Sequence, residues 1–178
     1  MEPAAKRLLI EHLPYELNML ESAMVFLTSA TFSEYRKQPF LRNCAIEAFW
    51  THARNLNEFM AKARNPNASG VAAARDFTVT EDRMKYELDE ELRNKINSQI
   101  SHLRYERATT NDEKLVTTDM LRVYAAINSV MKEFEDRLAQ EAKEIWKPRH
   151  PTEFITAVDF PQSTNATTSE TLFVRQVI

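Results

Sequence analysis

The chain has 178 residues, of which 43% are hydrophobic and 28% are charged, and its formal net charge is −3 at pH 7. That length suits one compact domain, alone or with a tail. Glycine normally makes up about 7% of a sequence, yet Gly70 is the only one here. Phosphate-cradling loops, dinucleotide-binding turns and tight β-hairpins all depend on glycine, so the composition excludes these sites and predicts an all-α fold.

Positive and negative charges are mixed along the whole chain, so the molecule as a whole exerts no long-range attraction on polyanions. Any contact with nucleic acid therefore has to be local. The longest uncharged stretch, residues 22–33, is too short to span a bilayer, and the first residues lack the apolar stretch of a secretory signal. These features predict a cytoplasmic protein that does not enter a membrane. The single cysteine, Cys44, is interpreted as a small core residue.

The first predicted helix covers residues 5–30, where apolar side chains recur at spacings of three and four. These side chains are Leu9, Leu13, Leu17, Leu20, Met24 and Leu27. Pro14 interrupts the pattern. Either the main helix begins at this proline, or one longer helix is kinked by it.

The second helix is predicted to begin at Pro39, which suits the first position of a helix, and to end near Ala63. Residues 65–79 then form a loop that contains Gly70, with a short extra turn as an option at residues 71–74.

Two capping-box patterns predict where the next two helices begin. Thr78 with Glu81 predicts a third helix that ends near Arg107, and Thr110 with Glu113 predicts a fourth helix. Apolar residues at heptad spacing predict that the fourth helix extends to about Trp146. At about 1.5 Å per residue this helix would be roughly 50 Å long, longer than the core of a compact monomer, and we therefore expect a homodimer.

Four amphipathic segments are most simply buried as a four-helix antiparallel bundle, which we assign to residues 1–147. Residues 148–178 are rich in proline, threonine and serine and form an irregular C-terminal tail. The apolar end of this tail, residues 172–174, is either disordered or docked as an extended segment on a protein partner.

Candidate binding residues lie on the second helix. At about 100° per residue, His52 and Asn55 fall on one stripe with apolar neighbours. These neighbours are Leu41, Ala45, Ala48 and Phe59. A buried imidazole or amide has to be hydrogen-bonded, so we expect a partner to reach both side chains. The favoured interpretation is a satisfied structural network; the alternative is a polar ligand pocket that also includes Arg54.

Candidate catalytic residues gather at the end of the third helix, where His102, Arg104, Tyr105 and Arg107 fall within two turns. A histidine can move the proton of a ribose 2′-hydroxyl, and an arginine can stabilise the charged phosphate, so this set could cleave RNA without a metal. The simpler interpretation is that these residues close the end of the bundle. The histidines are isolated from one another, so no metal site is expected, and no cofactor is expected either.

Two segments, EAFWTHARNLNEF at residues 47–59 and INSQISHLRYER at residues 96–107, resemble small bacterial helical proteins that are HEPN-like. The resemblance implies a four-helix bundle that often dimerises. It also implies relatives that are metal-independent ribonucleases of toxin and defence systems, or non-catalytic binders of nucleotides or RNA. The family signature, an arginine followed four to six residues later by histidine, occurs here only at Arg7 and His12, whereas His102 and Arg107 have the reverse order.

The leading hypothesis is therefore an intracellular HEPN-like binding module for RNA, a nucleotide or a protein partner. The first alternative is a metal-independent endoribonuclease that uses His102 with Arg104 or Arg107. The second alternative is a structural module for protein interaction.

Overall fold

A computed structural model describes residues 1–61, 72–80, 84, 90–92 and 117–147. These residues are mostly helical, and the only extended pairing among them is an isolated antiparallel bridge between Thr78 and Leu138. The prediction of an all-α fold is confirmed for the residues that the structure describes. Most of the third predicted helix and all of the predicted tail lie outside the described residues, so the four-helix bundle itself stays a prediction.

The first helical run continues past its proline. It consists of α1 (Pro3–Arg7), a π-helical turn (Leu8–His12) and α2 (Leu13–Thr28). The N–H of Leu13 donates to the carbonyl of Leu8, five residues earlier, directly before Pro14. Proline has no N–H to donate, so the regular helical ladder fails at this point and a wider turn absorbs the mismatch. Of the two alternatives, the structure therefore has the longer, interrupted helix.

Two short 3₁₀ turns, Ala30–Phe32 and Tyr35–Lys37, connect α2 to α3 (Pro39–Ala61). Phe26 lies in the last turn of α2 and Ser29 directly follows the helix, and the guanidinium of Arg36 donates to the carbonyl groups of both residues. Pro39 is the first residue of α3, as its sequence position predicts. Its missing N–H costs nothing there, because that N–H would have no helical acceptor.

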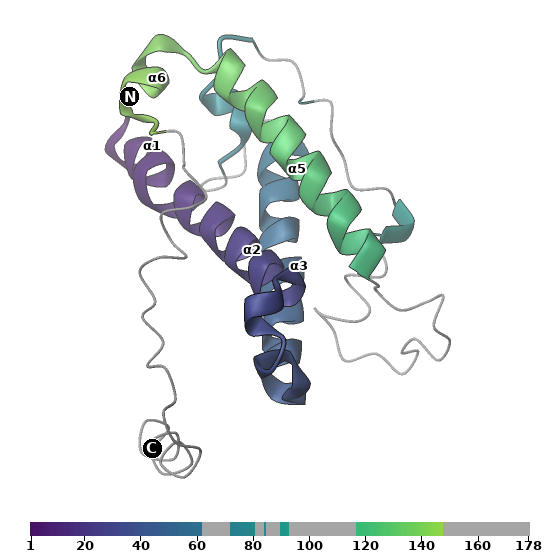
Figure 1. Cartoon of the computed structure of the whole chain (residues 1–178). Coiled ribbons are helices and arrows are strands. Elements are labelled where there is room, and N and C mark those ends of the chain that lie inside the picture. Colours follow the sequence, from purple (N-terminus) through teal and green to yellow (C-terminus); the bar gives the residue numbers. More distant parts are fainter. Residues whose placement is uncertain (62–71, 81–83, 85–89, 93–116, 148–178) are drawn as a thin grey trace, which may run out of the picture.

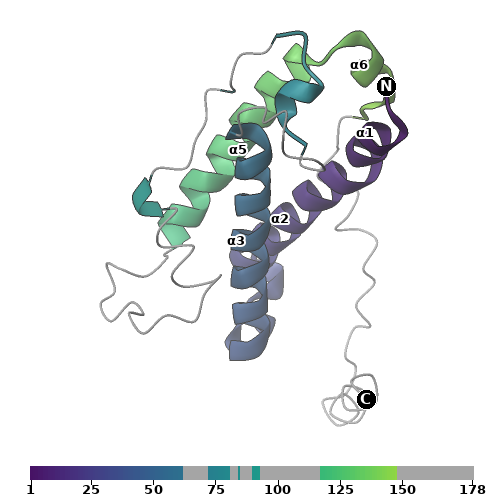
Figure 2. The same cartoon turned by 180° about the vertical axis from the view of Figure 1, so that it is seen from behind.

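Three long helices enclose the core. In both views α3 lies between α2 and α5 (Thr117–Arg137), and Figure 1 shows that α2 runs opposite to α3 while α5 runs in the same sense (Figures 1 and 2). The largest fully buried side chains come from all three helices and from the π turn. They are Leu9, Leu20, Phe49, Trp50, Leu56, Val123, Ile127 and Phe134. Their burial is the main stabilising contribution to this arrangement.

The prediction of one continuous fourth helix is wrong. The helix ends at Arg137, Ala139 has extended backbone angles (φ −63°, ψ 154°), and α6 (Gln140–Ile145) follows. Two backbone hydrogen bonds to a distant segment hold the break: Val79 N–H donates to Arg137 O at 2.9 Å, and Ala139 N–H donates to Phe77 O at 2.8 Å. Neither proline nor glycine marks this position. The described part of α5 has 21 residues and is about 32 Å long, and the break shortens the helix on which the length argument rested, so the homodimer stays a prediction.

The same pairing shows that the third helix does not begin directly after Thr78. Thr78 lies in the isolated bridge, its hydroxyl donates to the carbonyl of Thr80 at 2.8 Å, and residues 79–80 are not helical. The other half of the predicted capping box, Glu81, lies outside the described residues. Met84 is not helical, whereas residues 90–92 are. A 3₁₀ turn, Ala74–Asp76, precedes the bridge, so the optional extra turn in the predicted loop is present, shifted by a few residues.

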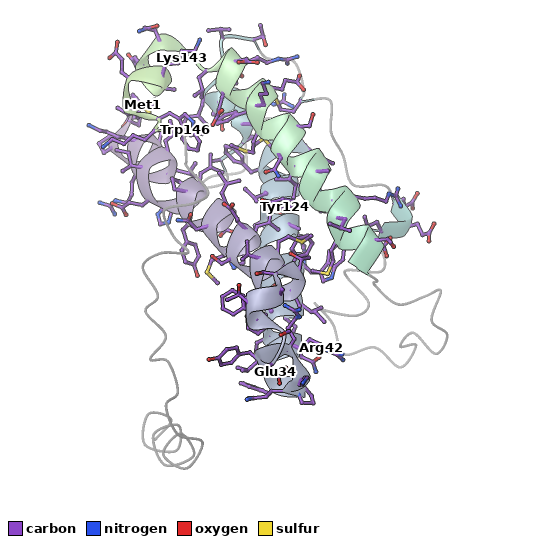
Figure 3. All side chains as sticks on the ribbon, viewed as in Figure 1. Met1, Glu34, Arg42, Tyr124, Lys143 and Trp146 are labelled. Carbon is purple, nitrogen blue, oxygen red and sulfur yellow. The ribbon has the colours of Figure 1, made fainter. Side chains whose placement is uncertain are left out.

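The end of the molecule beside α1 is closed by α6 (Figure 1). The amino group of Met1 donates to the Glu141 carboxylate at 2.8 Å, and this contact raises the pKa of the amino group above its usual value. The indole of Trp146 donates to Glu135 at 3.0 Å, and Figure 3 shows Met1, Lys143 and Trp146 gathered at this end. The short α6 is thus held by polar contacts as well as by its buried residue, Ala142.

The break between α5 and α6 can be tested with a proline substitution. Proline at position 140 would occupy the first turn of α6, where no helical N–H is needed, and Ala139 already has the extended angles that a residue before proline prefers. Gln140→Pro is therefore expected to change the free energy of unfolding by less than about 1 kcal/mol, measured by urea denaturation. The control, Ala125→Pro in the middle of α5, should cost about 3 kcal/mol or more. A loss of that size for Gln140→Pro would indicate a continuous helix.

Candidate functional site

The polar cluster predicted on the second helix is built around one carboxylate. Glu16, on α2, places its Oε2 atom 2.7 Å from Nδ1 of His52 on α3. The same oxygen accepts from the amide of Asn55 at 3.0 Å. The ring of Tyr15 stands edge-on to the imidazole, with 5.6 Å between ring centroids. Glu16 is therefore the partner that the sequence required without identifying.

The structure confirms part of the predicted stripe and corrects the rest. His52 is buried, with 8% of its surface exposed. Asn55 is exposed, so its placement on the inward face was wrong; it lies just outside the buried sector of α3 and still reaches Glu16. Arg54 lies about 160° round the helix from His52 and pairs with Glu58 at 3.1 Å. The three candidate binding residues therefore do not converge on one site.

The chemistry of this cluster is that of a satisfied network. A carboxylate can only accept, so the Nδ1 atom of His52 carries the proton that is shared with Glu16. One oxygen of Glu16 thereby satisfies a buried imidazole and an amide, which removes the cost of leaving them unpaired. This geometry supports the structural interpretation of His52 over the ligand pocket.

A cavity of about 530 Å³ lies where the end of α2, the start of α3 and the start of α5 meet. Its apolar wall comes from four side chains, and hydroxyl groups and three cationic residues complete the lining. The lining residues are Met24, Leu27, Thr28, Ser33, Arg36, Lys37, Arg42, Ile46 and Met120. No acidic residue is among these described side chains. They form an apolar hollow with a positive rim.

The three cationic side chains of this rim differ in the groups that they already bind. Arg36 is held by the carbonyl groups at the end of α2. Lys37 donates to both carboxylate oxygens of Glu34 at 2.7 and 2.8 Å. For the guanidinium of Arg42, which is exposed, the described part of the chain provides no hydrogen bond or ion pair. Figure 3 shows Glu34 and Arg42 at the same end of the helices. Arg42 is thus the cation that is available to a ligand.

A second cavity, of about 390 Å³, lies between α2 and α5 around Tyr124 (Figure 3). Two carboxylates, Glu21 and Glu135, and one cation, Lys132, line it. Glu135 also holds the indole of Trp146. The excess of negative charge among the described lining residues disfavours an anion in this cavity.

The predicted catalytic residues His102, Arg104, Tyr105 and Arg107 lie outside the described residues. The ribonuclease hypothesis therefore stays a prediction. The interpretation of Cys44 as a core residue was wrong, because this thiol is exposed on α3.

Sequence reasoning missed the positive cavity. The sequence signal for it is a short basic segment: three of the seven residues from 36 to 42 are basic, within a chain whose net charge is −3. Adjacency in sequence did not show that these residues share a cavity wall with Met24 and Met120, because those methionines come from two other helices.

Within the described ranges, no group of three or more histidine, cysteine, aspartate or glutamate residues is placed to hold a metal ion. None of the helices described is both long enough and apolar enough to cross a membrane. Comparison of the chain with protein-family models, with curated proteins and with solved structures finds no match. The HEPN-like relationship therefore stays a prediction.

Proposed function

We propose that this protein binds a phosphate-bearing ligand, RNA or a nucleotide, in the cavity between α2, α3 and α5. The observation that carries the proposal is the positive rim formed by Arg36, Lys37 and Arg42 beside an apolar wall. Guanidinium and ammonium groups are the side chains that hold phosphate oxygens by charge-assisted hydrogen bonds.

Local charge decides where such a ligand would bind. The net charge of −3 gives the whole molecule no attraction for a polyanion, so binding depends on a site where cations outnumber carboxylates. Among the residues that the structure describes, the lining of this cavity contains three cations and no carboxylate. The cavity between α2 and α5 has the opposite balance.

Size and apolar surface agree with one nucleotide unit. A cavity of about 530 Å³ falls within the range of about 300–1,000 Å³ that is usual for small-molecule sites. Met24, Leu27, Ile46 and Met120 provide an apolar wall against which a flat base can pack. A nucleotide unit combines such a base with a phosphate, and this combination matches the two halves of the lining.

Binding rather than catalysis is the activity proposed. No histidine is among the side chains that the structure places around the cavity. His52 is engaged by Glu16 and is buried. The described residues therefore provide no histidine beside the positive rim as a general base for the cleavage of RNA, and the carboxylate found there, Glu34, is bound to Lys37.

Arg42→Ala tests the proposal directly. The change is expected to weaken binding about tenfold, because it removes one charge-assisted contact worth about 1.4 kcal/mol. It should also reduce the steepness with which affinity falls as salt increases. The measurement is fluorescence polarisation with a labelled short single-stranded RNA and, separately, with a labelled adenosine monophosphate.

Arg54→Ala is the matched control, since it removes the same charge from the same helix at a position that pairs with Glu58 and does not line the cavity. Its affinity should equal that of the wild type within about twofold. Equal losses in the two variants would mean that binding follows total charge and not the cavity. Absence of saturable binding by the wild type would refute the proposal.

A further inference from the structure

Glu34 and Lys37 show how an anion is held at the rim of the cavity. The ammonium of Lys37 donates to Oε2 and Oε1 of Glu34 at 2.7 and 2.8 Å, so a two-oxygen anion already occupies it. Both side chains are exposed, 71% for Lys37 and 75% for Glu34, and the pair spans a single 3₁₀ turn. An exposed pair of this kind is weak and exchanges readily with another anion.

We propose that the ligand is recognised by a terminal phosphate, a phosphomonoester, and that this phosphate displaces Glu34 from Lys37. This inference rests on the proposed function and specifies its substrate class. The ligand has to replace the single negative charge of Glu34 on Lys37. A terminal phosphate carries about −1.5 to −2 at pH 7, whereas a phosphodiester within a strand carries only a single negative charge. At Lys37, a terminal phosphate therefore gains electrostatic energy over the carboxylate that it displaces, and a phosphodiester does not.

The three cations contribute to phosphate binding in different ways. Arg42 lines the same cavity as Lys37, and the described residues provide no other group for its guanidinium to bind. A terminal phosphate has three oxygens, which are enough to accept from Lys37 and from the planar fork of Arg42 together. Arg36 is committed to the carbonyl groups of Phe26 and Ser29, so it contributes positive potential and not the principal contact.

Two sources offer this chemistry: a free nucleotide and the phosphorylated end of an RNA strand. Four probes separate them by fluorescence polarisation or calorimetry. They are adenosine monophosphate, inorganic phosphate, a short RNA with a 5′-phosphate, and the same RNA with a 5′-hydroxyl. The inference predicts that the phosphorylated RNA binds at least about fivefold more tightly than the hydroxyl form, because only it carries the more highly charged group. Stronger binding of the phosphorylated RNA than of the monophosphate would identify the strand end as the source, and the reverse would identify the free nucleotide.

Glu34→Gln is the decisive variant, because it keeps the shape of the side chain and removes its charge. Binding of the monophosphate is expected to become about threefold tighter, as the competitor for Lys37 is weakened. Lys37→Gln should weaken binding about tenfold, and adding Glu34→Gln to it should give no gain, because the ammonium over which they compete is absent. Glu58→Gln is the control: it removes the same charge from an ion pair, that with Arg54, away from the cavity, and should leave affinity unchanged.

The outcomes separate this inference from the proposed function. Equal binding of the two RNAs, with no gain from Glu34→Gln but a loss from Arg42→Ala, would overturn the phosphomonoester inference and leave the cavity as a phosphate site. Failure of all four probes to bind would overturn both. A gain in Glu58→Gln equal to that in Glu34→Gln would show that total charge, not displacement at Lys37, controls affinity, and would also overturn the inference.

Discussion

Replacing Phe134 with alanine is expected to lower the free energy of unfolding by about 3–5 kcal/mol. Phe134 lies on α5 and has no exposed surface. Its ring meets Phe59 of α3 edge to face at a centroid distance of 5.7 Å, and Trp146 beyond α6 at 6.1 Å. The variant loses the burial of a large ring and both aromatic contacts, and leaves a cavity where three segments meet.

Urea denaturation followed by circular dichroism measures this loss. Leu121→Ala is the matched control, since Leu121 lies on the same helix with 49% of its surface exposed. Its replacement should change stability by no more than about 0.5 kcal/mol. Comparable losses in the two variants would mean that α5 packs with a different face toward α3 than the one described.

Replacing Glu16 with alanine is the second large effect, expected to cost about 1–3 kcal/mol. The reason is the group left behind: His52 is buried, and without Glu16 its Nδ1 atom loses the acceptor that lies at 2.7 Å. An unpaired polar group in the interior costs more than an ordinary hydrogen bond contributes. Thermal or urea denaturation of the variant checks the loss.

Glu58→Ala is the control for Glu16→Ala, because Glu58 also pairs with a side chain of α3, that of Arg54. This pair lies at the surface, with 40% of Arg54 and 46% of Glu58 exposed. Its cost should be only about 0.2–0.5 kcal/mol. The double variant Glu16→Ala with His52→Ala should lose less than the sum of the single losses, because the two side chains share one interaction. Equal effects of Glu16→Ala and Glu58→Ala would argue against a structural role for the network.

The candidate sites were only partly predictable from sequence. A buried histidine at position 52 and the need for a partner follow from helical periodicity and the cost of unpaired polar groups. The identity of that partner, Glu16, does not, because 36 positions separate the two residues and only the packing of α2 against α3 brings them together. The positive cavity was missed for the same reason: Met24, Arg42 and Met120 come from three helices.

What the sequence determined by itself is local. A single glycine and apolar residues at helical spacing are enough to predict the helical structure of the described residues, and Pro39 is enough to begin α3, because these effects act within a turn or two. Tertiary structure decided where α5 ends. No residue near Leu138 disfavours a helix; the break exists because residues 77–79 offer the backbone of Arg137 and Ala139 other hydrogen-bond partners. The same contacts turn Thr78 from a predicted helix cap into one half of a bridge, since a backbone group that is satisfied by a distant segment no longer needs the local helix.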